Sequence, residues 1–226
     1  MKKLGISRNG KVDLIKSSIG KWHFIKESKP NHPLMFVHIP KCGGTYCKTL
    51  FRELDILSVD KFESDLGIQG DDGVGRPHQL AKKSYSDNFI IFGVIRHPVD
   101  RFESLLNFTL GGGGPPKRKF IINDYIKKMG KNGTINDFVD MQTDEELLSY
   151  TPYRTLKYYS QNVDIFIKID ELENFLSFFG YKNIPKTDRK NASKRNYGYL
   201  SEKNKARIAR LFKDDIAFYN KKTNTN

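Results

Sequence analysis

The first candidate for chemistry is a glycine-rich loop between an apolar run and a helical pattern, at residues 38–46 (HIPKCGGTY). At a strand-to-helix junction, the free backbone N–H groups and the helix dipole attract an anion. Gly43 and Gly44 allow the backbone to approach a phosphate closely. Lys41 adds a positive charge, and Thr45 adds a hydroxyl group. The loop predicts a site for a phosphate-like anion; the alternative is a tight turn with an incidental lysine.

A second candidate is the segment at residues 94–104 (VIRHPVDRFES). Arg96 follows an apolar run, and Ser104 comes about two helical turns later. Arginine makes bidentate contacts with phosphate, and parallel sheets bind ligands at the carboxyl ends of their strands. We therefore expect Arg96 and Ser104 to serve one anion. The alternative is a surface salt bridge between Asp100 and Arg96 or Arg101, and for Arg101 alone this alternative is favoured.

The elements that would position these residues alternate along the chain. Three apolar runs predict buried strands of a parallel sheet, at residues 34–39, 89–95 and 163–169. A helical pattern follows each run, with apolar residues three or four positions apart. These residues are Cys47, Leu50, Phe51 and Leu54, then Val99, Phe102 and Leu106, then Leu172, Phe175 and Leu176. The alternation predicts a three-layer α/β sandwich with a mainly parallel central sheet.

Other parts of the chain have weaker patterns. Residues 22–26 suit a strand, and residues 117–161 suit several short helices. Ser201 is expected to cap one final helix, whose apolar face is Ile208, Leu211, Phe212 and Tyr219. Without internal repeats, we expect a single domain over residues 1–226, with residues 1–20 as a peripheral segment.

Composition limits the classes of partner and compartment. The 226 residues carry a formal net charge of +13, which favours anionic partners such as nucleotides, acidic glycans or nucleic acid. No apolar run is long enough to span a membrane, and no apolar core follows the basic N-terminus, so we expect a cytoplasmic protein. Cys42 and Cys47 are the two cysteines. They indicate neither a disulfide framework nor a zinc site, and we expect small buried residues and no bound metal.

The two candidate segments together resemble the nucleotide-binding signatures of the sulfotransferase family. The Pro-Lys-x-Gly-Gly-Thr loop resembles the family's 5'-phosphosulfate loop, and Arg-x-Pro-x-x-Arg-x-x-Ser resembles its 3'-phosphate site. The similarity covers residues 34–54 and 89–108, is weaker over 153–179, and is closest to the carbohydrate-type branch. It implies a fold related to nucleotide kinases, with 3'-phosphoadenosine-5'-phosphosulfate as donor and adenosine 3',5'-bisphosphate as product.

The resemblance also implies roles for individual residues. Lys41 would contact the 5'-phosphosulfate and stabilise the leaving group. The rest of the loop would surround the same anion with amides and hydroxyls, through Cys42, Gly43, Gly44, Thr45 and Tyr46. Arg96 and Ser104 would hold the 3'-phosphate. A late basic loop would cover that phosphate through Lys194 and Arg195; a solvated run of charges is an equal alternative.

Transfer to a hydroxyl also requires a base for its proton. His78 lies 18 residues before Arg96, at the exit of a glycine-rich stretch (67–77), an interval where several sulfotransferases carry a catalytic histidine. An imidazole titrates near neutral pH, which suits general-base catalysis. An exposed loop histidine is the alternative. The rival candidates for the base are His97, His38, Glu53 and Glu63.

The leading interpretation is therefore a sulfotransferase acting on an acceptor hydroxyl, with an anionic glycan as one candidate acceptor. The glycine- and proline-rich loop at residues 110–119, which ends in Lys117, Arg118 and Lys119, is expected to line the acceptor site. A nucleotide or small-molecule kinase of related fold is the first alternative, although the lysine of the ATP-binding P-loop is missing. A basic nucleic-acid-binding module is the second, although no recognised nucleic-acid motif is present, and we expect no nucleic-acid partner.

Overall fold

The computed structural model describes residues 2–3, 14–16, 22–24, 34–59, 80–87, 89–113, 124–130, 132–150, 155–185 and 196–223. The chain divides into two compact units. The first contains Met1–Arg96, Arg154–Lys190 and Ala217–Asn226. The second contains His97–Tyr153 and Asn191–Ile216.

The first unit contains a four-stranded sheet in which every pairing is parallel. Its order is β5 (Leu57–Ser58), β4 (Leu34–Val37), β6 (Ile90–Ile95) and β7 (Ile165–Lys168). The three apolar runs thus form the three predicted strands, with slightly shorter bounds, and the chain has an α/β fold. Strand β5 was not predicted, because two half-buried residues leave no pattern in a sequence.

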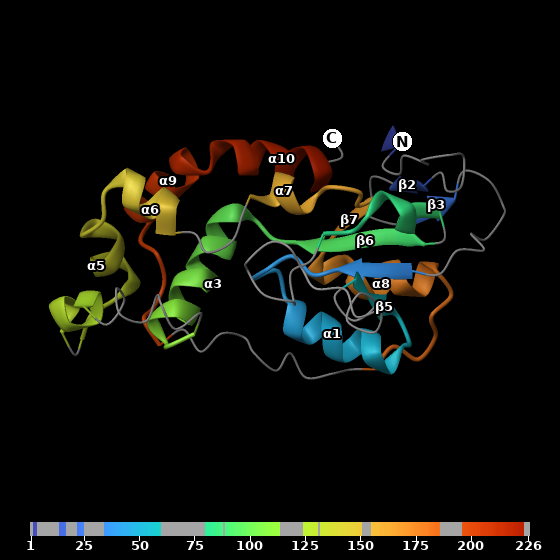
Figure 1. Ribbon diagram of the computed structural model, residues 1–226, viewed down its shortest axis with the longest axis horizontal. Helices are drawn as coiled ribbons and strands as arrows, with labels where there is room; N and C mark the ends of the chain where they lie inside the picture. Colours follow the sequence, from blue (N-terminus) through green and yellow to red (C-terminus); the bar gives the residue numbers. More distant parts are fainter. Residues whose placement is uncertain are drawn as a thin grey trace. The chain divides into compact units, whose positions relative to one another are not determined.

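Both faces of this sheet are buried. Successive side chains of a strand point to opposite faces, so neighbouring residues of one strand pack into different cores. On one face, Phe36 and Phe92 pack with residues of α1 (Gly44–Glu53) and α8 (Leu172–Phe178). On the other face, Met35 and Val37 pack with α7 (Leu156–Tyr159). Figure 1 shows α1 and α8 on one side of the sheet and α7 on the other. The first unit therefore has the predicted layers of helix, sheet and helix.

Short elements complete the first unit. A separate antiparallel sheet consists of β1 (Lys2–Lys3), β2 (Leu14–Lys16) and β3 (Trp22–Phe24). Strand β3 falls within the weak pattern at residues 22–26, whereas β1 and β2 were not predicted. Two 3₁₀ helices are η3 (Lys83–Asp87) and η4 (Ile169–Glu171).

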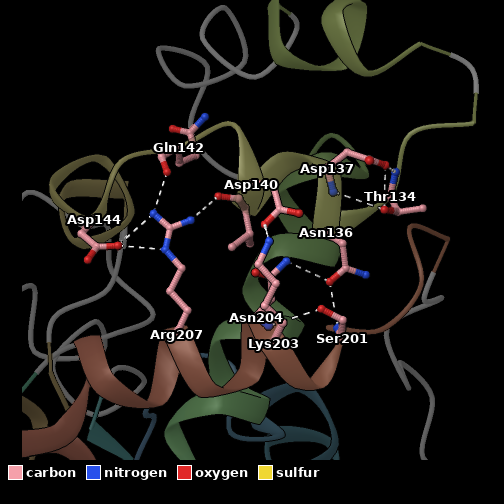
Figure 2. A network of polar contacts seen from close by, with 11 residues as sticks. Thr134, Asn136, Asp137, Asp140, Gln142, Asp144, Ser201, Lys203, Asn204 and Arg207 are labelled. Atoms are coloured by element: carbon pink, nitrogen blue, oxygen red, sulfur yellow. Dashed lines mark hydrogen bonds and ion pairs between the residues drawn. The ribbon is translucent and has the colours of Figure 1, made fainter.

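The second unit is built from helices, and several of them lie in the stretch 117–161 where short helices were predicted. They are α3 (Pro98–Leu110), helical residues 124–129, α5 (Ile135–Asp140), α6 (Asp144–Tyr150) and α9 (Glu202–Leu211). Their apolar faces share one core, formed by Val99, Phe102, Leu106, Leu110, Ile135, Phe138, Val139, Leu147, Leu200 and Ile208. Arg207 of α9 donates to Val139 O, Gln142 O and the Asp144 carboxylate, which ties α9 to α5 and α6 (Figure 2).

The prediction of one final helix is wrong, because α9 is followed by a separate helix, α10 (Lys213–Thr223). The predicted N-cap holds: the Ser201 side chain accepts from the Asn204 N–H. The break falls at Phe212, where φ is −105° and ψ is 29°. No glycine or proline marks it, but the Phe212 ring lies 5.4 Å from the Phe102 ring. This contact joins residues 110 positions apart, so a local pattern could not indicate it.

Candidate anion site

The glycine-rich loop makes a compact turn between β4 and α1. The Cys42 N–H donates to Ile39 O at 3.3 Å. Lys41 has φ = 63° and Gly43 has φ = 89°, so two residues of the loop adopt left-handed backbone. Glycine adopts this conformation at little cost, whereas lysine rarely does. A strained lysine at a strand end is typical of functional sites, and it marks Lys41 as the residue of interest in the loop.

Helix α1 starts without a cap from any side chain in the described part of the chain. Gly43 is its N-cap and has no side chain, and the first turn contains no acidic residue. Gly43 and Thr45 are exposed, so the start of the helix reaches the surface. The first N–H groups of a helix have no partner within it, and its dipole adds partial positive charge there. A bound anion would supply both the cap and the countercharge.

Gly44 is required by packing. A Cβ at this position would run into the imidazole ring of His38, against all three of its nearest ring atoms. The His38 ring in turn lies 6.2 Å from the Phe36 ring. His38 therefore packs directly behind the loop.

Lys41 and Arg96 follow neighbouring strands of the sheet. Strands β4 and β6 are parallel, with Val37 opposite Gly93, so both residues lie at the same edge. The pKa of Lys41 is lowered from 10.5 to about 8, chiefly by burial and also by the positive charge of Arg96. A site that holds two like charges together and partly desolvates one of them favours an anionic ligand.

The two cysteines are buried free thiols, as predicted. Burial is the largest cause of the raised pKa of the Cys47 thiol. Cys47 packs in the core below α1, whereas Cys42 packs against the opposite face of the sheet. Tyr46 is half-buried against the same core as Cys47. The loop would therefore contact an anion through backbone groups of Cys42 and Tyr46 more readily than through a thiol.

The second motif is divided between the two units. Arg96 is half-buried at the end of the first unit, while Ser104 is buried in helix α3 of the second. The ion pair of Arg101 is with Asp215, at 3.8 Å between NH1 and Oδ2, and both side chains are buried. The expected surface pairing of Arg101 with Asp100 is thus replaced by a buried pair within the second unit. The buried pair stabilises the second unit.

Several predicted residues lie outside the described residues. They are His78, Glu63, Lys194, Arg195 and residues 114–119 of the expected acceptor loop. Among the rival bases, Glu53 is the last residue of α1 and is exposed. A helix rises about 1.5 Å per residue, which places Glu53 about 13 Å along the axis from Gly44. Glu53 is therefore remote from the loop, whereas His97 is the N-cap of α3.

Within the described ranges, no group of three or more histidine, cysteine, aspartate or glutamate side chains could hold a metal ion. In the same ranges, no helix is long and apolar enough to cross a membrane. Neither a protein-family model, nor a curated protein, nor a solved structure matches the chain.

Proposed function

We propose that the protein is a sulfotransferase that moves a sulfuryl group from 3'-phosphoadenosine-5'-phosphosulfate to an acceptor hydroxyl, that of a carbohydrate. The observation that supports this most strongly is the pairing of Lys41 with Arg96 at one sheet edge, beside the uncapped start of α1. Three sources of positive potential converge there, which suits a donor with several anionic groups. The resemblance of the two motifs supports the choice of donor.

The chemistry explains the need for a lysine in the loop. By analogy with phosphoryl transfer, an in-line, loose transition state leaves positioning and charge stabilisation to the protein. A bond forms between the acceptor oxygen and sulfur, and the bond between sulfur and the 5'-phosphate oxygen breaks. Negative charge grows on that leaving oxygen. The Lys41 ammonium group donates a hydrogen bond to it and balances the growing charge.

The remaining assignments follow the resemblance. The backbone from Cys42 to Tyr46 contacts the 5'-phosphosulfate, and Arg96 contacts the 3'-phosphate. The resemblance also implies phosphate contacts for Ser104, Lys194 and Arg195. The acceptor proton passes to His78, and no metal ion is required.

Ligand-dependent melting tests the donor assignment. Adenosine 3',5'-bisphosphate at a hundred times its dissociation constant should stabilise the fold by about 2.7 kcal/mol. AMP, which lacks the 3'-phosphate, should bind less tightly, and ATP with magnesium should give little shift. A larger shift with ADP or ATP would favour a kinase. Binding to generic DNA that falls steeply with salt would favour the nucleic-acid module.

The base has a separate test. His78→Ala should lower kcat by about 10²–10⁴-fold, the range for loss of a general base. The dissociation constant of adenosine 3',5'-bisphosphate should stay unchanged, because the base contacts the acceptor and not the donor. If His78→Ala retains most of its turnover, the base lies elsewhere and His97 becomes the next residue to replace.

A further inference from the structure

A short stretch of chain just before helix α9 is held by two side chains of α3. The Tyr197 N–H donates to Asn107 Oδ1 at 3.2 Å, and Asn107 Nδ2 donates to Gly198 O at 3.1 Å. The Leu200 N–H donates to Glu103 Oε2 at 3.0 Å, one helical turn earlier on α3. Asn107 and Glu103 are both buried, and buried polar groups are costly unless they find hydrogen-bond partners. These bonds therefore hold the stretch in one register.

The same segment, Tyr197–Leu200, is also held from helix α5. Asn136 Nδ2 donates to Tyr199 O at 2.9 Å, and Asn136 Oδ1 accepts from the Ser201 N–H at 2.8 Å (Figure 2). Every residue of the segment therefore has a backbone group bonded to a side chain of α3 or α5. Helix α9 starts directly behind it, with Ser201 as the N-cap. The backbone of the segment is thus fixed from both sides and at its end.

This fixed segment presents an aromatic ring to solvent. Tyr199 is 62% exposed, more than any other large hydrophobic residue in the described ranges, whereas the neighbouring Leu200 is buried. Aromatic side chains are typical of binding surfaces, because they supply a large contact area with few rotatable bonds. A ring on a fixed backbone also loses less freedom when a ligand binds. Tyr199 is therefore prepared to contact a ligand.

The charges that follow the segment speak against an anionic ligand. Lys203 pairs with Asp140 at 3.3 Å (Figure 2), and Lys205 pairs with Glu202 at 2.7 Å. A single-stranded nucleic acid stacks its bases on aromatic rings, but it also needs cations for its phosphates. Both lysines already have a carboxylate partner. A ligand on Tyr199 is therefore expected to be uncharged where it meets the ring.

The neighbours of Tyr199 in the sequence are polar. Asn196, Ser201 and Glu202 are exposed. A protein partner usually covers a contiguous apolar patch, which a single ring does not provide. A sugar presents one face of C–H groups, whose partial positive charge suits the negative face of an aromatic ring. Its hydroxyl groups stay among polar side chains and water. A sugar ring therefore fits this surface better than a nucleobase or an apolar protein surface.

We propose that Tyr199 is a sugar-binding residue, on which one ring of the carbohydrate acceptor stacks. The side chains of Asn107, Glu103 and Asn136 fix the backbone that carries it and do not touch the sugar. The inference deepens the proposed function and rests on it for the choice of a carbohydrate. Tyr199 contributes affinity for the acceptor and takes no part in bond making or breaking.

Calorimetry without donor tests the stacking directly. The probes are neutral oligosaccharides of glucose, galactose or N-acetylglucosamine, and at least one of them should bind the full chain. Tyr199→Ala should weaken that binding by about tenfold or more, as expected for a truncated aromatic anchor. Tyr199→Phe keeps the ring and should bind within about twofold of the unsubstituted chain. Leu148→Ala is the matched control, because Leu148 of α6 is 45% exposed in the same unit, and its loss should leave the affinity unchanged.

Asn136→Ala tests the anchor, because it removes the bond to Tyr199 O and leaves the ring intact. In a variant shown to be folded by its melting curve, binding should weaken by about twofold to tenfold, the cost of ordering one more side chain. The inference is overturned if no oligosaccharide binds, or if Tyr199→Ala binds as tightly as the unsubstituted chain. Binding of a single-stranded oligonucleotide that depends on Tyr199, without binding of any sugar, would also overturn it. The proposed function has a separate readout, since it loses its donor site if adenosine 3',5'-bisphosphate does not bind.

Discussion

Binding of adenosine 3',5'-bisphosphate should take up protons above pH 7, and Lys41 is the group that should bind them. Burial and the charge of Arg96 lower the pKa of Lys41 from 10.5 to about 8 in the free protein. A phosphate beside the ammonium group favours its charged form and raises the pKa again. Between the two pKa values, the free protein binds fewer protons than the complex. Binding therefore consumes protons, and it weakens as pH rises.

The size of the effect follows from the two pKa values. If the ligand restores an ordinary lysine pKa of about 10.4, uptake should be about 0.1 proton at pH 7, about 0.5 at pH 8 and about 0.9 at pH 9. The dissociation constant should rise about tenfold from pH 7 to pH 9 through the same linkage. A phosphate monoester has a second pKa of about 6, so the ligand is already ionised across this range.

The assay is calorimetry at pH 7, 8 and 9 in buffers with different heats of ionisation. The dependence of the observed heat on the buffer gives the number of protons bound. Lys41→Arg is the matched control, since arginine stays charged at every pH used and should abolish the uptake. Lys41→Met removes the charge and should abolish it too, with weaker binding.

Tight binding without proton uptake at pH 8 and 9 would refute the reasoning, because the ligand would then not lie beside a partly neutral Lys41. Uptake that persists in Lys41→Arg would assign the proton to another group. The free protein offers an independent check. The pKa of Lys41 is lower in the folded protein than in the unfolded chain, so the unfolded chain binds more protons between pH 8 and 10.5. The contribution of Lys41 to the free energy of unfolding should therefore increase as pH rises from about 8 to 10.5.

Three further variants test the structure around the site. Arg96→Ala should weaken binding of adenosine 3',5'-bisphosphate by about 1.5–3 kcal/mol, the range for a hydrogen bond to a charged group, and an unchanged dissociation constant would remove Arg96 from the site. Gly44→Ala should lower the free energy of unfolding by about 1–3 kcal/mol, because the new methyl group overpacks against His38. Adding His38→Ala should restore part of that free energy, whereas additive losses in the double variant would contradict the contact. Arg101→Ala should cost about 3–5 kcal/mol in urea denaturation, because it removes a positively charged partner of the buried Asp215 carboxylate. A loss below about 1 kcal/mol would show that the pair is not desolvated.

The central strands could be predicted because strands buried on both faces appear as continuous apolar runs. Phe36 and Phe92 illustrate this, since they sit in adjacent strands and their rings lie 5.6 Å apart in the core. Strand β5 and the break at Phe212 could not be predicted. The first is too short to show a period, and the second accompanies a contact with Phe102 that is distant in the sequence.

The site was partly predictable for the same topological reason. Lys41 and Arg96 each follow a predicted parallel strand, so the sequence could place them at one edge of the sheet. The left-handed backbone of Lys41 and the contact of Gly44 with His38 depend on exact backbone geometry. The bonds of Glu103 and Asn107 to residues 90 and more positions away were also out of reach. Their spacing on α3 was the one available signal.

Transfer of radiolabelled sulfur from 3'-phosphoadenosine-5'-phosphosulfate tests the central claim most directly. A panel of hydroxyl acceptors, led by glycans, should include one class that becomes labelled without added metal, with release of adenosine 3',5'-bisphosphate. Lys41→Ala should fold, as shown by its melting curve, and should lose turnover because the leaving oxygen is no longer stabilised. Undiminished transfer by Lys41→Ala would contradict the assigned role of this lysine. Labelling of the same acceptors from the γ-phosphate of ATP, with none from the sulfuryl donor, would contradict the claim as a whole.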